Sequence, residues 1–217
     1  MESRIASVEL RDAAQLSALA NQLRGREAAA DDVFESIYPA AFRESSQCFW
    51  TPVSVALRAA EWLVRGPETR VLDVGSGVGK MCIVGALSTG ATFVGVERRP
   101  HFVAAAIRAA ERLEARSARF VVGAFEDQDV TAYDGVYLFN PFEENLWGPS
   151  DWLDDTVDLS EARFRDDVDR AIAWLSRARP KTRVVTYHGF GGTFPPDYRL
   201  EEREWCRGGF LDAWVKT

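Results

Sequence analysis

Hydrophobic residues in the first part of the chain recur at helical spacing. Between residues 7 and 37 they form two groups, which predicts two helices broken near Gly25. The groups are Leu10, Leu16, Leu19 and Leu23, followed by Val33, Phe34 and Ile37. Pro39 ends the second helix, because proline cannot continue the helical hydrogen bonds. We expect a loop after it, and then a third helix that Thr51 caps and Pro52 begins.

From Arg70 onward, short apolar runs of strand length alternate with longer amphipathic segments. The strand-like runs are 70–74, 92–96, 119–122, 135–139 and 182–187. The helical segments are 78–89, 100–116 and 160–178. Strands that alternate with helices of this length predict a parallel sheet with helices on both faces.

The end of the chain departs from this alternation. Residues 198–207 and 210–217 are strand-like, and only Gly208-Gly209 separates them, which predicts a closing antiparallel hairpin. The whole pattern predicts an α/β fold: a doubly wound, mostly parallel sheet of seven strands that ends in a hairpin. We expect residues 1–52 to form an N-terminal helical cap, or lid, and residues 53–217 to form the main domain.

Composition narrows the class of protein. The chain has 217 residues, of which 47% are hydrophobic, so it can bury one sizeable core. It contains no apolar stretch near the roughly 20 residues that span a membrane, and its acidic N-terminus does not resemble a secretory signal. Its three cysteines are widely spaced and it has two histidines, which disfavours disulfides and metal sites. A reducing, cytoplasmic location fits this cysteine usage best.

The formal net charge of −7 disfavours loose electrostatic binding to nucleic acid or to an anionic membrane. Basic residues gather between Arg163 and Arg183, but acidic residues are interleaved with them. This arrangement is typical of a solvated helix face. We therefore expect a small molecule or a protein as the partner and no membrane, and the charge disfavours nucleic acid.

The segment VLDVGSGVGK (71–80) places glycines directly behind the first predicted strand. A phosphate-binding P-loop would need glycine at Val74 and Ser or Thr at Met81, so that motif is excluded and Lys80 is expected only to begin a helix. A dinucleotide loop prefers G-x-G-x-x-G, whereas the spacing here is G-x-G-x-G. Glycines let the main chain approach a ligand closely. Asp73 suits a cationic ligand and would repel a pyrophosphate.

The pattern D-x-G-x-G-x-G after a first strand closely resembles motif I of the class I, Rossmann-like methyltransferases that use S-adenosylmethionine (SAM). Residues 70–142, about a third of the chain, resemble this family. DVGSGVGK followed by GVE is similar to the Dot1-like lysine methyltransferases, and FNPF at 139–142 is similar to their N-N-F. The resemblance implies a bacterial-type SAM-dependent methyltransferase with S-adenosylhomocysteine (SAH) as its product.

The resemblance and the residues together suggest a cofactor site. In the loop, the expected cofactor-binding residues are Asp73, Gly75, Ser76, Gly77 and Gly79. Glu97 ends the second predicted strand, near the roughly 20-residue spacing at which an acid meets ribose hydroxyls. After the third strand, Ala124 stands where class I enzymes often have Asp. We therefore expect Phe125 to pack on the adenine, with Glu126 or Asp127 at the adenine amino group.

FNPFEEN (139–145) follows the fourth predicted strand, at the carboxyl edge of the sheet where ligands bind in such folds. It resembles the [DN]-P-P-[FYW] motif of N-methyltransferases, with one proline missing. We expect Asn140, which also borders the cofactor, and the Pro141 carbonyl to accept hydrogen bonds from an amine while Phe142 forms a wall. The candidate bases are Tyr38, Glu143, Glu144 and His188.

Two aromatic segments are expected to enclose this site. Phe42, Phe49 and Trp50 are candidates to close over it from the cap, and the acid-rich segment 147–161 forms a second wall. The tryptophans of that segment suit a cationic or aromatic amine. The sequence thus predicts a SAM-dependent methyltransferase acting on a small-molecule or protein acceptor, with nitrogen favoured. A nucleic-acid base N-methyltransferase and a non-catalytic SAM-binding protein stay open as alternatives.

Overall fold

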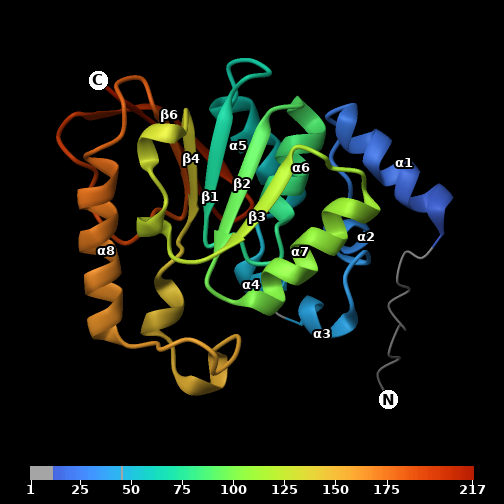
Figure 1. Cartoon of the computed structure of the whole chain (residues 1–217), viewed down its shortest axis with the longest axis horizontal. Helices are drawn as coiled ribbons and strands as arrows, with labels where there is room; N and C mark the ends of the chain where they lie inside the picture. The colour runs from blue at the N-terminus through green and yellow to red at the C-terminus, as the bar shows by residue number, and fades with distance from the viewer. Residues whose placement is uncertain (1–11, 45) are drawn as a thin grey trace.

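A sheet of seven strands runs through the centre of the molecule, in the order β3-β2-β1-β4-β5-β7-β6 (Figure 1). The computed structural model describes residues 12–44 and 46–217, without the side chain of Gln47. Residues 1–11 of the predicted cap, including Leu10, lie outside the described residues. The strands are β1 (Arg70–Val74), β2 (Thr92–Glu97), β3 (Ala118–Val122), β4 (Gly135–Phe139), β5 (Arg183–Tyr187), β6 (Tyr198–Cys206) and β7 (Gly209–Lys216).

The register of the sheet confirms the predicted fold class. Strands β1 to β5 pair in parallel, and β7 pairs antiparallel with both β5 and β6. The predicted strands coincide with β1 to β5 to within a residue or two, and the predicted closing hairpin is formed by β6 and β7. This is the strand order of a doubly wound sheet that ends in an antiparallel hairpin.

Helices cover the two faces of the sheet unequally. The α-helices are α1 (Ala13–Arg24), α2 (Asp31–Glu35), α3 (Ala40–Arg43), α4 (Ser46–Phe49), α5 (Val53–Leu63), α6 (Lys80–Thr89), α7 (Pro100–Arg112) and α8 (Glu161–Leu175). In Figure 1, α8 lies on one side of the sheet while α5, α6 and α7 lie on the other. The α8 side also holds the short 3-10 turns η1 (Phe125–Asp127) and η2 (Val130–Ala132).

Strand alternation divides the core into two clusters, one on each face. On β1, Leu72 and Val74 belong to the cluster on the α8 side, whereas Val71 belongs to the cluster beneath α5 and α6. Helix α6 is buried all round because α1 and α5 cover its outer surface, so it shows no polar face. No helix within the described residues has the length and apolarity needed to cross a membrane.

The segment before α5 differs from the sequence prediction. We expected a loop after Pro39, but the chain forms the short helices α3 and α4 there. Thr51 does not cap α5; its hydroxyl lies 3.0 Å from the hydroxyl of Tyr137. The backbone N–H of Val53 instead donates to Oδ1 of Asp31, at 2.8 Å. The cap therefore comes from α2, 22 residues away, which local sequence cannot reveal.

Asp31 and Lys80 join the N-terminal helices to the main domain. Lys80 is the first residue of α6, as expected, but its side chain is only 3% exposed. Its Nζ donates to Oδ1 of Asp31 and to Oε1 of Glu35, both at 2.8 Å. Burial raises the pKa of Asp31, but hydrogen bonds from Lys80 and Val53 outweigh burial and hold this pKa below its ordinary value. From the β6–β7 turn, Arg207 reaches the other oxygen of Asp31.

Substituting Lys80 by Met should destabilise the protein by about 3 kcal/mol, because it leaves the largely buried Glu35 without its ion-pair partner and Asp31 with only the more exposed Arg207. Urea denaturation measures this change in the free energy of unfolding. As a control, Arg165→Met removes an exposed pair with Glu161 and should cost less than about 1 kcal/mol. Adding Glu35→Gln to Lys80→Met should recover part of the loss. Equal effects of the two single substitutions would contradict a structural role for the Lys80 network.

Candidate active site

The glycine loop between β1 and α6 has a backbone that only glycine adopts easily. Gly75, Gly77 and Gly79 all have positive φ, at 72°, 51° and 84°. A Cβ on Gly79 would lie 2.5 Å from the ring of Phe120, so this position is also closed sterically. The backbone N–H groups of Gly75 and Ser76 donate to the carbonyl of Val96, at 2.9 and 3.1 Å. The loop is thereby held against the end of β2.

Glu97 is fixed in place by main-chain donors. The N–H of Gly77 donates to Oε2 and the N–H of Arg99 donates to Oε1, both at 3.0 Å. Glu97 is 7% exposed and borders a cavity at the carboxyl edge of the sheet. Because each carboxylate oxygen accepts more than one hydrogen bond, both oxygens keep capacity for a ligand hydroxyl.

The cavity brings together most of the predicted site residues. Those that line it are Gly75, Gly77, Glu97, Phe125, Asn140, Pro141, Phe142, Glu143 and Glu144. Phe49 and Trp50 line it from the cap, and Trp147 lines it from the acid-rich segment. The rings of Phe49 and Trp147 contact each other with centroids 4.8 Å apart, so the two expected walls meet. Phe42 instead packs on Phe102, with ring centroids 5.8 Å apart.

Three of the expected cofactor-binding residues, Asp73, Ser76 and Gly79, do not line the cavity. Asp73 is 3% exposed and lies on the α6 side of β1, where the thiol of Cys82 donates to its Oδ2 at 3.4 Å. The hydroxyl of Ser76 lies close to Gly95, where an added Cβ would come within 2.5 Å of it. Gly79 faces Phe120, as described above. These residues shape the loop, and Asp73 adds a buried carboxyl beneath it.

On the expected adenine side, the structure separates the two predicted residues. Phe125 lines the cavity, and its ring lies 5.6 Å from the rings of both Phe142 and Trp174. Glu126 does not line it; its Oε1 instead accepts a hydrogen bond from Arg170 of α8, at 3.2 Å. A helix-face arginine that faces η1 therefore draws this carboxylate away from the cavity.

Asn140 occupies a strained position at the end of β4. Its φ is 37°, a conformation that is uncommon for residues other than glycine. Its N–H donates to the carbonyl of Gly189, and its own carbonyl accepts from Glu143. Asn145 steadies the following turn by donating to the carbonyl of Phe142 at 2.9 Å. Such strain is found where the surrounding structure holds a functional side chain in place.

Two of the candidate bases do not reach the cavity. Tyr38 is 1% exposed, donates to the carbonyl of Val78 at 2.9 Å, and has a pKa well above its usual value because it is buried. His188 is exposed beside Phe139, with its ring packed on Tyr187 and against Gly209. Neither residue lines the cavity. Both were predicted from their positions in the chain, which do not define where a side chain points.

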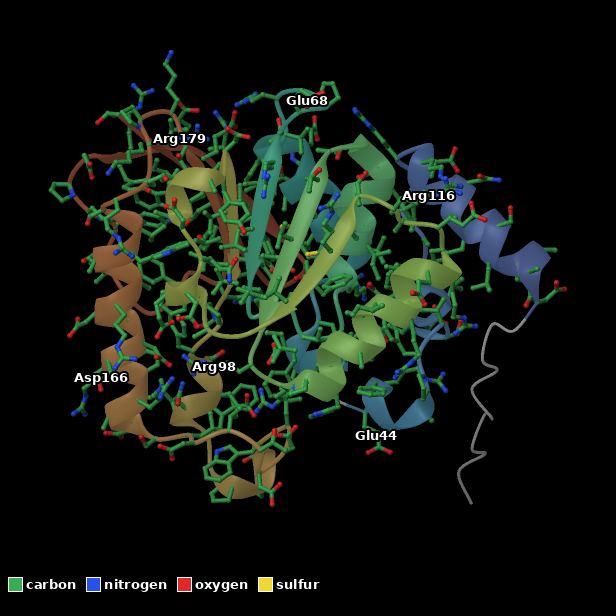
Figure 2. The ribbon with its side chains drawn as sticks, viewed as in Figure 1. Glu44, Glu68, Arg98, Arg116, Asp166 and Arg179 are labelled. Carbon is green, nitrogen blue, oxygen red and sulfur yellow. The ribbon has the colours of Figure 1, made fainter. Side chains whose placement is uncertain are left out.

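Sequence reasoning missed two arginines that follow Glu97. Arg98 lies between the ends of the strands and α8 (Figure 2) and pairs with the fully buried Asp167 at 3.1 Å. Arg99 pairs with Glu144 at 2.8 Å and with Asp154 at 2.9 Å. Both arginines line the cavity. The only sequence signal was an Arg pair directly after the acidic strand end, and it did not reveal the partners.

The described residues contain no cluster of three or more side chains that could hold a metal ion. The cavity instead presents a glycine-lined main chain, carboxylates that main-chain N–H groups hold in place, and several aromatic walls. A group with ribose hydroxyls and a flat ring matches these features in chemical type.

Comparisons with known proteins agree with this geometry. Residues 66–145 match a family model described as a methyltransferase domain. No curated protein matches the chain. An RNA methyltransferase from Salinibacter ruber, solved with S-adenosyl-L-homocysteine, aligns with a TM-score of 0.56 at 22% identity, covering 76% of this chain and 92% of that one.

Two further solved structures share the fold. A putative methyltransferase, yhhF, from Escherichia coli aligns with a TM-score of 0.52 at 14% identity, over 72% of this chain and 80% of that one. A variant of MtNAS in complex with S-adenosylmethionine aligns with a TM-score of 0.54 at 14% identity, over 94% of this chain and 72% of that one. Residues 66–145 thus match a methyltransferase domain, and the chain shares its fold with structures that hold SAM or SAH, which together support a SAM-dependent methyltransferase.

Proposed function

We propose that the cavity holds SAM with its ribose at Glu97 and its adenine beside Phe125, and that a methyl group passes to a nitrogen atom at Asn140. The observation that carries this proposal is that Glu97, at the end of β2, and Asn140, directly after β4, line one cavity on either side of the glycine loop that follows β1. The fit is chemical as well as spatial. A Cβ at Gly77 would meet only open space, a Cβ at Gly75 would lie 3.3 Å from Pro141, and Glu97 is already oriented by the N–H of Gly77.

The aromatic acceptor end supports an amine as the acceptor. Phe49, Phe139 and Trp147 line it, with Asn140 and Glu143 as polar groups. Asn140 Oδ1 and the Pro141 carbonyl are suited to accept N–H hydrogen bonds, which would direct the nitrogen lone pair. The resemblance of DVGSGVGK and GVE to Dot1-like lysine methyltransferases supports nitrogen as the acceptor atom and leaves the class of substrate open. Closure by Phe49 and Trp147 would exclude water.

SAM supplies an electrophilic methyl group, so the protein needs to position and desolvate the acceptor and has little covalent chemistry to perform. An ammonium acceptor must first lose a proton. Glu143 is the candidate for this step because it lines the cavity and has no ion-pair partner among the described residues. Glu144 is less suited, since Arg99 binds both of its oxygens.

A nucleic-acid base is the alternative acceptor. The FNPF segment is close to a motif of N-methyltransferases, and the relative from Salinibacter ruber is an RNA methyltransferase. The net charge of −7 counts against a polyanionic acceptor. A non-catalytic SAM-binding protein is a weaker alternative, because Asn140 is held in a strained conformation at the edge of the cavity.

Replacing Glu97 by Gln or Ala should weaken SAM and SAH binding at least tenfold, because charge-assisted hydrogen bonds to the ribose would be lost. Isothermal titration calorimetry measures this, with NAD as a ligand control and Glu161→Gln, an exposed acid on α8, as a matched variant. Failure of the wild type to bind SAM at millimolar concentration would overturn the proposed function. Unchanged affinity in both Glu97 variants would overturn only the ribose assignment.

Asp73 should make stability depend on pH. Burial raises the pKa of Asp73 to about 7, against the hydrogen bond from Cys82 and with a smaller contribution from the charge of Glu97. Because this folded-state pKa lies above the unfolded value, the folded protein binds the extra proton and loses stability as pH rises towards 7.

Between pH 5 and 8, wild type should lose up to about 3 kcal/mol relative to Asp73→Asn, which cannot titrate there. Urea denaturation at the two pH values measures the difference. Parallel pH profiles for the two proteins would show that Asp73 does not titrate in this range.

Asn140→Gly and Asn140→Asp should retain SAM affinity to within a few-fold but lower methyl transfer about a hundredfold, as for other lost positioning groups. The Gly variant also tolerates the positive φ at this position, so it separates side-chain loss from strain. Transfer is followed with methyl-labelled SAM and cell extract separated into metabolites, protein and RNA. Labelling of the RNA fraction alone would favour the alternative acceptor. Wild-type turnover in both variants would refute the acceptor site.

A further inference from the structure

Arg99 connects three carboxylates that come from different parts of the chain. It is 6% exposed and follows the end of β2 at the start of α7. Its Nη2 donates to both oxygens of Glu144, at 2.8 and 3.0 Å, and its Nε donates to Asp154 at 2.9 Å. Its backbone N–H binds Glu97, and its Nη1 lies 4.0 Å from the same carboxylate oxygen.

Two of these carboxylates organise the segment 147–159, which we call the roof. The N–H of Leu153 donates to Oε1 of Glu144 at 2.8 Å, and Thr156 donates to Oδ1 of Asp154 through its N–H and its hydroxyl. The roof residues that line the cavity are Trp147, Leu153, Val157 and Leu159. Arg99 is therefore the direct link between the roof and the strand end that carries Glu97.

The charge balance makes this link strong. One guanidinium faces three carboxylates, and His101 contacts the far oxygen of Asp154 at 3.1 Å. Arg98 does not neutralise the group, because it pairs with Asp167 on α8. Without Arg99, the carboxylates would repel one another across a poorly solvated space. The roof carries one of the three carboxylates, Asp154, and is hydrogen-bonded to a second, Glu144, so this repulsion would move the roof away from the strand end.

We propose that Arg99 is a positioning residue that couples occupation of the cofactor cavity to closure of the roof over the acceptor site. This inference rests on the proposed role of Glu97 at the ribose. A ribose that binds Glu97 contacts a carboxylate that the backbone N–H of Arg99 already holds. The side chain of Arg99 in turn holds the roof through Asp154. Filling the cavity and ordering segment 147–159 then favour each other.

The test uses the full chain, with SAH as the ligand and hydrogen exchange of 147–159 as the structural readout. In wild type, SAH should slow exchange in this segment. In Arg99→Met, exchange should be fast without ligand, SAH should slow it little, and SAH affinity should fall about tenfold, a typical size for coupled sites. Arg99→Lys keeps the charge but loses the fork geometry, so it should recover part of both effects.

Arg183→Met is the matched control. Arg183 is also largely buried and pairs with Glu201, but it lies at the opposite edge of the sheet. It should lower stability without changing SAH affinity or roof exchange. Wild-type exchange of 147–159 in Arg99→Met would overturn the role of Arg99 and leave the cofactor site standing. Absence of SAH binding by wild type would instead overturn the proposed function, and the coupling with it.

Discussion

The buried contact between Lys80 and the carboxylates of α2 holds the architecture of this protein together. Lys80 begins the helix that follows the glycine loop, and Asp31 belongs to the N-terminal part of the chain. Asp31 also caps α5 and receives Arg207 from the closing hairpin. The carboxylate of Asp31 thus fixes α6, which follows the glycine loop, the start of α5 and the closing hairpin relative to the N-terminal helix α2. Buried ion pairs often add little net stability, but they specify geometry where both partners are required.

Buried ion pairs also hold the cavity in place, but there the opposite charges are not balanced. There the acids outnumber the base, since Glu97, Glu144 and Asp154 surround Arg99. An excess of negative charge beside the proposed site of a cationic methyl donor favours its binding. It also makes the enclosure sensitive to a single side chain. The ion-pair networks of Lys80 and Arg99 together hold the loops at the carboxyl edge of the sheet in the positions that form the cavity.

Methyl transfer fits an enclosure of this kind. The reaction requires close approach, alignment and exclusion of water more than it requires acid or base strength. Aromatic side chains from the cap and from the acid-rich segment meet above the cavity, as the contact of Phe49 with Trp147 shows. In the proposed function, these aromatic segments enclose the acceptor, while the glycine loop and the end of β2 hold the cofactor.

Much of the fold follows from local sequence pattern. Strand and helix periodicity located β1 to β5 and the major helices, and the Gly208-Gly209 pair located the hairpin, because these signals depend on neighbouring residues. The prediction that Thr51 caps α5 was wrong because the cap depends on a residue far away in the sequence. Asp31 caps the helix from 22 residues away, and the hydroxyl of Thr51 contacts Tyr137 instead.

The residues of the site also fall into those that local sequence predicted and those that only the tertiary structure placed. The glycine spacing and Glu97 were legible in the sequence, because a ligand that needs bare main chain and a fixed acid imposes residue types at set distances. The direction of a side chain is not encoded in this way. Only the folded chain turned Glu126 towards Arg170 and buried Tyr38. Folding also brought Glu144 and Asp154 to Arg99, across 45 and 55 residues. These ion pairs form only in the folded chain, because the sheet places the ends of its strands side by side.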